Sequence, residues 1–488
     1  MKHETRRKHT SPDQREDGSS PRKKPPADAV NEAKPPNRDT QGRFSERGLT
    51  RERRFLDRPR VPANLERLIE AYIEKKTGKR WDDPVVLSRL RAAVIAQKRD
   101  YWREGEKRHI SYHTGYQVLG YLAYQLPVFF VQFQHLLLEL AREGLIKPDL
   151  RVFDVGTGPG VVPLAVIDFL RRAGGGSATL FGLDASEEHC EAYRFLVPAS
   201  AGKNPHIHVE PPLCADLRIV SRDRLPGDID LMVFSNVLNE IREVTPQQRV
   251  ELLTRYAASL ADQGTMAVIE PADLSNATAL RQITMAATEK GPLGVYAPCT
   301  FLWGERCVPT SCWSFIEHPA VQPTRLMRAL AEDPEPYRYL NTDIKFSYAL
   351  LRKDGLTRCR FRVRPNAPFL RMSKLPFHVD HRVNVVGAVM SGDIGDPRHL
   401  VMKLCDGTTA TPVYVVMPRY YQGRATSPLL EATYGDILEL RQVLVRYNDR
   451  YGAYNLLITG ASQVQPPGGV GPPSRSVHGG SRSRRELK

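Results

Sequence analysis

The sequence has few cysteines, no long apolar run and no secretory signal. Seven of its 488 residues are cysteine, too few for a disulfide-stapled scaffold, so clustered cysteines are candidate ligands. Its most apolar stretch, 118–140, is interrupted by Gln, Pro and His residues, which argues against a membrane span. The charged first ten residues lack an apolar core. We therefore expect a cytoplasmic protein with reduced thiols and no membrane partner.

The net charge of +15 is concentrated at the two ends. Residues 1–60 hold 17 Lys and Arg against 10 Asp and Glu, and residues 465–488 hold 5 against 1. Both segments lack apolar periodicity, which predicts disordered basic tails at 1–60 and 465–488. Such tails suit a polyanionic partner such as RNA, although solvated disorder without a partner gives the same pattern.

Residues 61–148 are predicted to be helical. Apolar residues between Leu65 and Ile73 recur at helical spacing, and Pro127 is expected to start or kink a helix. From residue 149 short β-rich runs alternate with helical stretches, which predicts an α/β domain at 149–375 with a doubly wound, mostly parallel sheet. The expected strands are Arg151–Val155, Thr179–Leu183, Asp230–Phe234, Thr265–Glu270 and Lys345–Arg352. A Cys-rich insert, 291–325, precedes the last of them.

Residues 376–464 are predicted to form an OB-like β-barrel. Five strands with one helix-permissive segment, 420–434, after the third give the plan of that fold. The expected strands are Arg382–Met390, His399–Cys405, Pro412–Met417, Ile437–Tyr447 and Tyr454–Ala461. The region also interleaves cations and aromatics, as single-strand binding demands, although ordinary surface decoration is the alternative. These residues are Arg419, Tyr420, Tyr421, Arg424, Arg441, Arg446, Tyr447, Arg450, Tyr451 and Tyr454.

A glycine-rich turn follows the first predicted strand and precedes a helix, and this favours S-adenosylmethionine (SAM) as ligand. Asp154 lies beside the turn, where it can hold a cationic amine, and Asp184 ends the next strand, where it can accept ribose hydroxyls. Asp216 is placed to accept from an adenine amino group. NAD binding and a purely structural turn are the alternatives. The candidate turn residues are Gly156, Thr157, Gly158 and Gly160.

The end of the strand at 230–234 is the expected transfer site, because ligands bind at the carboxyl ends of parallel strands. A strand end followed by a helix cap is the plain alternative. The sequence has neither an Asn-Pro-Pro-Tyr nor an Asp-Pro-Pro-Tyr motif, the usual mark of amine methylation on bases. The candidate catalytic residues are Ser235, Asn236, Asn239 and Glu240.

Cys299, Cys307 and Cys312 lie close together in the sequence and are candidate metal ligands. A zinc or cubane iron–sulfur site needs a fourth ligand, for which Cys405 and Cys359 are the candidates. Incidental clustering is the alternative to a metal. The remaining two cysteines, Cys190 and Cys214, are expected to pack as small apolar residues.

Together these motifs resemble the ribosomal small-subunit methyltransferase-like family, which has mitochondrial, bacterial and archaeal members. The resemblance rests on Asp-Val-Gly-Thr-Gly-Pro-Gly from Asp154, Ser-Asn-Val-Leu-Asn-Glu from Ser235, Ile-Glu-Pro from Ile269, the three clustered cysteines and Lys-Phe-Ser-Tyr-Ala-Leu-Leu-Arg from Lys345. It implies a class I SAM-dependent methyltransferase fold, a four-cysteine iron–sulfur (4Fe–4S) site and small-subunit rRNA as partner. It also implies Cys405 as fourth ligand, with zinc as the alternative metal.

Two functions are therefore expected. The first is a SAM-dependent methyltransferase that acts on RNA in ribosome assembly or translation, and the RNA expected is small-subunit rRNA. The second is an RNA-binding assembly factor that keeps the fold and the metal site without transferring methyl groups. A small-molecule or protein methyltransferase is a third reading, and DNA is not an expected partner.

Overall fold

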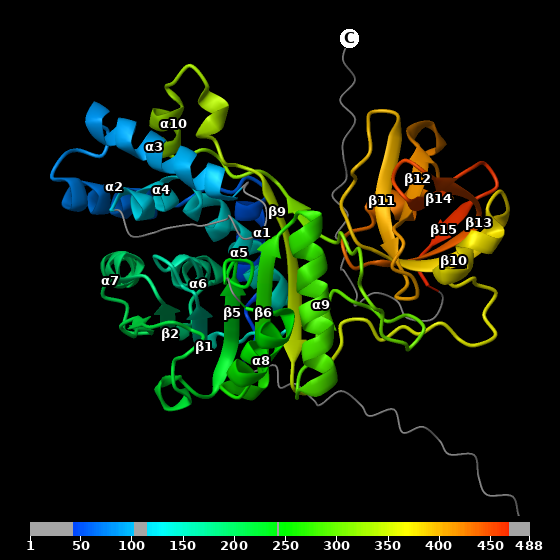
Figure 1. The fold of residues 1–488 in the computed structure, drawn as a ribbon, viewed down its shortest axis with the longest axis horizontal. Helices are drawn as coiled ribbons and strands as arrows, with labels where there is room; N and C mark the ends of the chain where they lie inside the picture. The colour runs from blue at the N-terminus through cyan, green and yellow to red at the C-terminus, as the bar shows by residue number, and fades with distance from the viewer. Residues whose placement is uncertain (1–41, 102–114, 242–243, 468–488) are drawn as a thin grey trace, which may run out of the picture. The chain divides into compact units, whose positions relative to one another are not determined.

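The computed structural model describes residues 42–101, 115–241 and 244–467, and the chain begins there with a group of helices (Figure 1). The helices are α1 (Glu46–Leu56), α2 (Ala63–Thr77), α3 (Pro84–Tyr101), α4 (Tyr116–Tyr124) and α5 (Leu126–Arg142). Pro127 lies in the first turn of α5, as predicted, where its missing N–H breaks no helical hydrogen bond. Within the described ranges, no helix combines the length and apolarity that a bilayer span requires.

Helix α1 corrects the prediction of a disordered tail as far as residue 60. Ser45 caps the helix by accepting a hydrogen bond from the Gly48 N–H, and Leu49 and Leu56 are buried. Glu52 is fully buried and pairs with Arg172 at 2.6 Å. Four arginines in α1 raise its charge, so a count of composition does not reveal its apolar stripe. The second predicted tail also starts too early, because Gln465 belongs to a strand, Gln463–Gln465. Residues 1–41 and 468–488 of the two predicted tails lie outside the described residues.

A nine-stranded sheet forms the centre of the α/β domain. Its strands are β1 (Asp149–Val155), β2 (Ser177–Asp184), β3 (Ile207–Val209), β4 (Leu213–Cys214), β5 (Ile229–Ser235), β6 (Leu260–Pro271), β7 (Gly294–Ala297), β8 (Ile316–His318) and β9 (Ile344–Arg352). The order is β3-β2-β1-β5-β6-β9-β7, with β4 beside β2 and β8 beside β9. The pairs from β3 to β6 are parallel, whereas β9 runs antiparallel to both its neighbours. The order reverses between β1 and β5, which places the ligand crevice at their carboxyl ends.

Two apolar layers cover the sheet, and the strand residues alternate between them. Val152 belongs to the apolar cluster that includes residues of helices α1 to α7, whereas its neighbour Phe153 belongs to the cluster that includes residues of helices α8 and α9. The helices that follow β1 in the chain are α6 (Val161–Ala173), α7 (Glu187–Ala201), α8 (Pro246–Ala257), α9 (Leu274–Lys290) and α10 (Arg325–Ala331). Because strands are buried on both faces, they read as continuous apolar runs, which is why the five predicted strands were visible in the sequence.

The predicted Cys-rich insert, 291–325, is partly sheet. It begins with β7 and ends near β8, and both strands pair with β9. The boundary at residue 291 is therefore too early, because the first residues of the segment complete the sheet edge. The part without sheet pairing lies between these two strands and carries the three clustered cysteines.

A closed five-stranded β-barrel follows the α/β domain. Its strands are β10 (Arg382–Val389), β11 (His399–Cys405), β12 (Val413–Pro418), β13 (Ile437–Asn448) and β14 (Ala453–Leu457). They pair in the order β10-β11-β12-β14-β13, and pairing of β13 with β10 closes the barrel. Helix α11 (Ser427–Glu431) follows the third strand, as predicted, and a short strand that sequence reasoning missed, β15 (Gln463–Gln465), extends β13. Short 3-10 turns lie at Arg222–Arg224, Pro336–Arg338, Met372–His378 and Arg419–Tyr421.

Candidate functional site

The three glycines of the turn after β1 have different roles. All three have positive φ angles, +77° at Gly156, +54° at Gly158 and +92° at Gly160. A Cβ on Gly156 would lie 2.4 Å from a methyl of Val237, and one on Gly160 would lie 2.3 Å from a methyl of Val197, so packing alone requires these two. A Cβ on Gly158 would meet nothing closer than 4.0 Å. Gly158 is thus the glycine that leaves space for a ligand.

Asp154 lies near the end of β1 as a buried carboxyl group, and the Thr157 side chain is close enough to lower its pKa. Its side chain is 1% exposed, and its Oδ1 atom has no hydrogen-bond partner among the described residues. Burial raises the pKa of Asp154 to about 7. A buried carboxyl oxygen without a partner costs folding free energy, which a cationic ligand group would recover. The residue therefore fits the predicted role of holding an ammonium group.

Asp184 ends β2, as predicted, but the protein itself already binds its carboxylate. The N–H groups of Gly158 and Ser186 each donate to it at 2.8 Å, and His189 Nδ1 lies 3.5 Å away. Burial would raise the pKa of Asp184, but His189 and the two N–H groups hold it below its ordinary value. Thr157 completes the turn by donating its N–H to the Leu183 carbonyl.

Asp216 is also engaged within the protein. The Arg218 guanidinium contacts both of its oxygens at 2.6–3.1 Å, and this hydrogen bonding is the first cause that lowers the pKa of Asp216. The structure therefore brings Asp154 and Asp184 to one edge around Gly158. An adenine contact by Asp216 would have to compete with Arg218.

The four candidate catalytic residues follow β5 at the same edge. Ser235 ends the strand, and Asn236 has a φ of +57° and donates its N–H to the Ile269 carbonyl. Val237 packs on Gly156, which joins this loop to the glycine turn. Both polar side-chain atoms of Asn239 are buried without a hydrogen-bond partner among the described residues. Glu240 lies close enough to Glu270 to raise the pKa of that group.

Sequence reasoning missed three residues at this edge, which are Glu270, Tyr121 and His189. Glu270 is 2% exposed and accepts a hydrogen bond from the Leu238 N–H at 3.1 Å. Burial first, and then the charge of Glu240, raise the pKa of Glu270 to about 8. Its signal in the sequence was a carboxylate at the end of an otherwise apolar strand. The Tyr121 hydroxyl comes from helix α4, and no local motif links it to the glycine turn.

The predicted metal ligands line one small cavity. Cys299, Cys307, Cys312 and Cys405 surround a space of about 30 Å³, larger than one buried water needs. Cys312 is placed by its own N–H, which donates to the Thr278 hydroxyl of α9 at 3.0 Å, and Cys405 is placed as the last residue of β11. We call this space the thiol cavity. The alternative fourth ligand, Cys359, is absent from its lining, and its sulfur lies 3.7 Å from the Phe361 carbonyl.

Two cations, Arg281 and Lys403, also line the thiol cavity. Arg281 is 2% exposed and donates to the Tyr348 carbonyl at 2.6 Å and to the Ser314 hydroxyl at 3.0 Å. Lys403 is 5% exposed. Burial raises the pKa of Cys299, Cys307 and Cys405 to about 12. Without a bound cation these thiols are therefore neutral at pH 7, and the buried positive charges of the cavity lack an anionic counterpart there.

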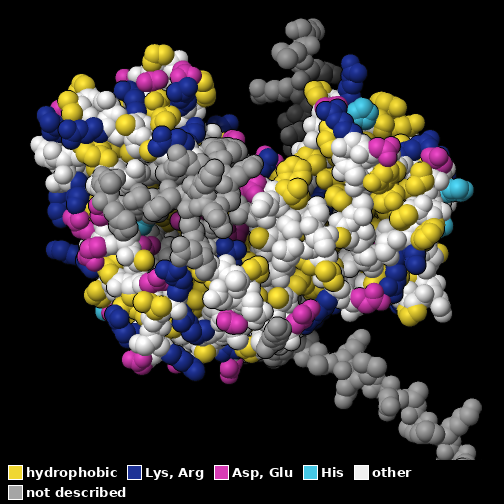
Figure 2. Space-filling model, in the orientation of Figure 1, with side chains coloured by type: hydrophobic (Ala, Val, Ile, Leu, Met, Phe, Trp, Pro, Cys, Tyr) yellow, Lys and Arg dark blue, Asp and Glu magenta, His cyan; other side chains and the backbone are white. Residues whose placement is uncertain are grey.

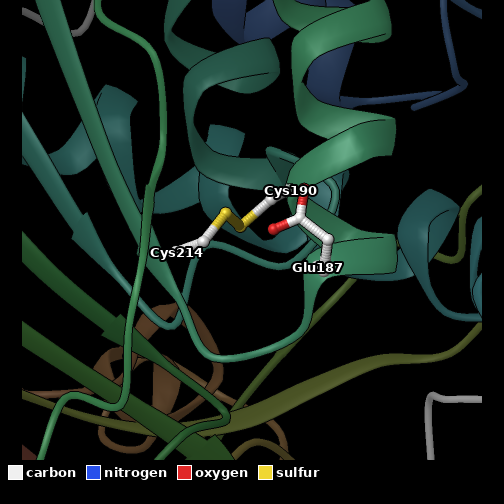
Figure 3. Close-up of side chains that lie close together, drawn as sticks. All are labelled: Glu187, Cys190 and Cys214. Atoms are coloured by element: carbon white, nitrogen blue, oxygen red, sulfur yellow. A yellow bond between two sulfur atoms is a disulfide. The ribbon is translucent and has the colours of Figure 1, made fainter.

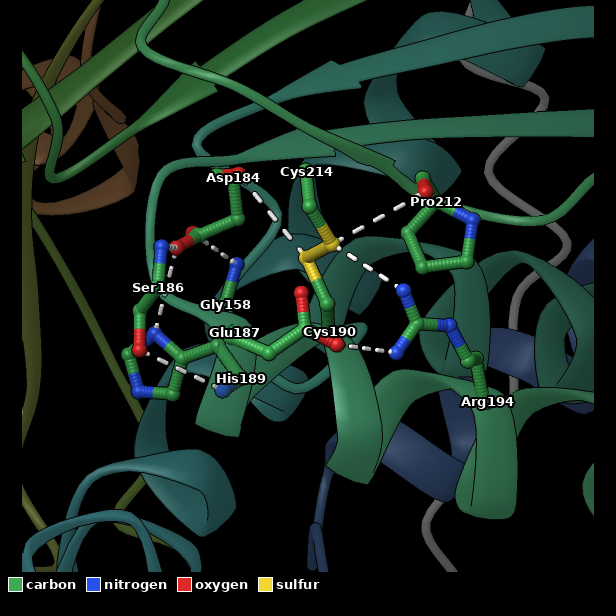
Figure 4. Close-up of a disulfide and its surroundings, with 9 residues drawn as sticks. All are labelled: Gly158, Asp184, Ser186, Glu187, His189, Cys190, Arg194, Pro212 and Cys214. Carbon is green, nitrogen blue, oxygen red and sulfur yellow. Dashed lines mark hydrogen bonds and ion pairs between the residues drawn. A yellow bond between two sulfur atoms is a disulfide. The ribbon is translucent and has the colours of Figure 1, made fainter. Parts of the chain in front are cut away.

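Cys190 and Cys214 depart from the prediction that they pack as free, apolar residues. The structure joins them in a disulfide across a Cα–Cα distance of 6.3 Å, which lies within the range that a disulfide spans. Helix α7 and strand β4 approach each other here because both flank the end of β2 (Figure 4). With Glu187 they form the one group in the described chain whose potential metal-ligand atoms all lie within 4.8 Å of one another.

The barrel separates the predicted cation–aromatic set into two groups. Tyr420, 80% exposed, follows the end of β12, whereas Tyr451, 67% exposed, lies in the β13–β14 turn. Since β12 and β14 are parallel and in register from Val413 opposite Tyr454, the two tyrosines lie at opposite ends of β14. Three of the arginines form ion pairs within the barrel, namely Arg419 with Asp393, Arg441 with Glu439 and Arg446 with Asp380.

Comparisons with known proteins give one family match to part of the chain and matches of low similarity to solved structures. A family described as the C-terminal domain of a domain of unknown function, DUF8157, matches residues 373–467, which are the barrel. No curated protein matches the chain.

Many solved structures match at low similarity. Mitomycin 7-O-methyltransferase MmcR is 21% identical, with 31% of this chain and 45% of that one covered and a TM-score of 0.23. The chain thus spans less than half the length of MmcR. Magnesium protoporphyrin IX methyltransferase ChlM from Synechocystis PCC 6803 is 11% identical, with 55% of this chain and 98% of that one covered and a TM-score of 0.28. A TehB-like SAM-dependent methyltransferase from Corynebacterium glutamicum is 12% identical, with 46% of this chain and 97% of that one covered and a TM-score of 0.24. The strand order with its antiparallel β9 is that of the class I methyltransferase fold.

Proposed function

We propose that this chain is a SAM-dependent methyltransferase that acts on RNA, and specifically on small-subunit rRNA. The observation that supports it most is the buried carboxyl group of Asp154, which precedes the glycine turn at the switch point of the sheet and has, among the described residues, only the Thr157 side chain as an internal hydrogen-bonding neighbour. A Gly-rich turn with an acid that can accept an ammonium group suits SAM better than a dinucleotide, whose pyrophosphate Asp154 would repel.

SAM would supply a methyl group activated by its sulfonium. Asp154 would accept hydrogen bonds from its ammonium group, and Gly158 would let its backbone approach closely. Asp184 would face the ribose, where its bonds to the Gly158 and Ser186 N–H groups fix its orientation. Glu270, with its pKa raised to about 8, and the neighbouring Glu240 are the groups placed to hold the proton that leaves the acceptor.

RNA is proposed as the substrate because of the barrel and the charge distribution. Exposed aromatics beside cations offer stacking surfaces for single-stranded bases, and Tyr420 and Tyr451 place such surfaces at both ends of β14. On the face shown in Figure 2, Lys and Arg side chains alternate with acidic ones. The excess positive charge of the chain lies mainly in the terminal segments, where it would add binding that weakens with salt.

For the thiol cavity we propose a 4Fe–4S cluster held by Cys299, Cys307, Cys312 and Cys405. A tetrahedral zinc site with bonds of about 2.3 Å brings its sulfurs to about 3.8 Å from one another. In the described chain no three of these four sulfurs lie within 4.8 Å of one another, so the proposal rests on the cavity that they line together and not on a preformed ligand geometry. A cubane cluster takes one thiolate on each of four irons and so spreads its ligands further. Arg281 and Lys403 would offset the negative charge of the thiolate-bound centre.

A second candidate is an RNA-binding assembly factor without methyl transfer. It is favoured by the internal engagement of the two other cofactor acids, since Asp184 and Asp216 already accept hydrogen bonds from the protein. The missing base-methylation tetrapeptide points the same way.

Methyl transfer to RNA separates the two candidates. Full-length protein incubated with methyl-labelled SAM and small-subunit rRNA or its precursor particles should label the RNA. Asp154→Asn should abolish labelling because it removes the charge that holds the ammonium group, whereas Asp262→Asn, on an exposed acid, should not. If the wild-type protein binds S-adenosylhomocysteine but labels no RNA, the enzymatic proposal is rejected and the assembly factor is favoured.

A further inference from the structure

The disulfide lies beside the proposed cofactor site but takes no part in it. Cys190 is in the second turn of α7, and Cys214 is the last residue of β4. Figure 3 shows the two sulfurs with the Glu187 carboxylate directed toward them. Figure 4 adds Arg194, whose guanidinium lies between Glu187 and Cys214. Nothing in the proposed methyl transfer uses this disulfide.

The two sulfurs have different surroundings. Cys190 is fully buried, whereas Cys214 is only half-buried. One guanidinium nitrogen of Arg194 lies 3.2 Å from the Cys214 sulfur, and the other donates to Glu187 at 2.6 Å. Glu187 thereby orients the guanidinium onto Cys214. The Arg194 cation at 3.2 Å favours the thiolate of a reduced Cys214, whereas the Glu187 carboxylate, within 4.8 Å of both sulfurs, opposes it. Access to solvent lets the Cys214 thiol react.

The two cysteines also lie beside Asp184, the residue that is expected to face the ribose. Asp184 is the register partner of Cys214 in the β2–β4 pairing, which covers only two residue pairs. The Asp184 carbonyl accepts the Ala215 N–H at 2.9 Å and lies 3.8 Å from the Cys190 sulfur. A bond between the two sulfurs therefore fastens α7 to β4 on either side of Asp184. Without it, β4 is held to the sheet by a two-residue pairing, and the segment that follows with Asp216 is held by Tyr256, which donates to the Leu217 carbonyl at 3.0 Å, and by Arg255, which donates to the Arg218 carbonyl at 2.9 Å.

We propose that Cys214 and Cys190 are a redox-active thiol pair that takes a hydroperoxide as oxidant and controls cofactor affinity. The Cys214 thiolate attacks the peroxide oxygen, the O–O bond breaks, and the leaving alkoxide or hydroxide takes up a proton, which leaves a sulfenic acid on Cys214. The Cys190 sulfur then attacks the Cys214 sulfur, the S–S bond forms, and water leaves with the thiol proton. A dithiol reductant returns both electrons and restores the thiols.

Oxidation is expected to strengthen cofactor binding, because the crosslink holds the elements that carry Asp184 and Asp216 in place. The size of such a coupling between two sites is typically about tenfold. This effect on affinity rests on the proposed function, whereas the reaction of the thiols does not.

The thiol chemistry is tested first, without any cofactor. Full-length protein is reduced with a dithiol, freed of it, treated with hydrogen peroxide and analysed by peptide mass. We expect a Cys190–Cys214 crosslink in the wild type, and a sulfenic acid on Cys214, trapped with a cyclic diketone, in Cys190→Ser. Arg194→Gln should slow the reaction several-fold, and Cys359→Ser should leave it unchanged. If Cys214 reacts no faster than Cys359, or if the reduced pair and Glu187 bind zinc and resist peroxide, the proposal is overturned.

The coupling is tested by calorimetry with S-adenosylhomocysteine. The crosslinked protein should bind it roughly tenfold more tightly than the reduced protein, and Cys190→Ser should bind it equally after either treatment. If the crosslinked and reduced wild-type proteins bind the probe equally well, the proposal that the disulfide controls cofactor affinity is overturned. If neither form binds the probe, the proposed function fails, while the peptide masses still decide whether the pair reacts with peroxide.

Discussion

The glycine-turn edge and the thiol cavity are built in opposite ways. At the edge, Asp154, Gly158 and Asp184 come from one strand–turn–helix–strand unit, and parallel pairing of β1 with β2 aligns them. The thiol cavity takes three residues from the segment between β7 and β8 and a fourth from the barrel strand β11. The predicted cofactor-binding residues of the first site therefore come from one folded unit, whereas the second site needs two domains packed together.

Contacts between the barrel and the α/β domain show what maintains the thiol cavity. Asp406, next to Cys405, accepts hydrogen bonds from the Trp303 indole at 3.0 Å and from the Met372 N–H at 2.8 Å. Arg281 reaches the Tyr434 hydroxyl at 3.4 Å. A bound metal centre would add covalent links between the two domains, so the barrel's position and the metal should depend on each other.

The largest expected effect comes from a substitution that disrupts only the thiol cavity. Cys405→Ser should lose nearly all bound iron and sulfide, because a cubane cluster needs one thiolate on each iron. Anaerobically purified protein is expected to be brown in the wild type and colourless in the variant, with metal analysis as the measurement.

Cys359→Ser is the matched control, since Cys359 lies outside the cavity lining. Loss of iron from this variant, with retention in Cys405→Ser, would show that the fourth ligand is misassigned. Stoichiometric zinc in a colourless wild-type protein would replace the proposed cluster by a zinc site.

The next effect concerns the glycine-turn edge and depends on pH. The carboxyl group of Asp154, with its pKa raised to about 7, must lose its proton to hold an ammonium group. Affinity for S-adenosylhomocysteine should therefore fall by roughly tenfold per pH unit as pH decreases below 7, while the amine of the ligand stays protonated. Calorimetry between about pH 5 and pH 7 measures this slope.

Other groups face Asp154 and set the control for that slope. Asp184, Tyr121 and Tyr193 lie near it, and the Asp184 charge contributes to its raised pKa. Asp154→Asn should bind weakly with little pH dependence. Since the folded state holds this proton more tightly than the unfolded chain, the cofactor-free protein should lose stability as pH rises from about 4 to about 7. An affinity that is flat with pH in the wild type would contradict the assignment.

The same contrast explains how far the sequence could be interpreted. All five predicted sheet strands and all five predicted barrel strands are present, because continuous apolar runs and turn residues mark each of them locally. Helix α1 was missed because its only two buried leucines, Leu49 and Leu56, are seven residues apart, and the other buried positions are a glycine and a glutamate. The boundary of the Cys-rich insert was misplaced because β7 has only four residues and is a strand only through its pairing with β9, which is distant in the sequence.

For the sites, the sequence revealed residues that belong to local motifs but not residues that are brought together by long-range contacts. Asp154 and Asp184 could be assigned because the strand ends fix their positions. The choice between Cys405 and Cys359 could not be made from the residues, since it depends on how the barrel packs. Tyr121 and the Cys190–Cys214 pair were missed for the same reason, because each involves elements that meet only in the folded chain.

The smallest expected effect distinguishes packing from ligand binding within the glycine turn. Gly156→Ala should destabilise the protein by roughly 3 kcal/mol, because its methyl would overlap Val237 in addition to the left-handed backbone. Gly158→Ala meets open space and should cost only about 1 kcal/mol from its backbone conformation. Its methyl would instead occupy the space left for the ligand, so S-adenosylhomocysteine binding should weaken far more than stability. Denaturant unfolding and calorimetry on both variants measure the two effects, and a Gly158→Ala protein that binds normally would show that the ligand does not approach the turn there.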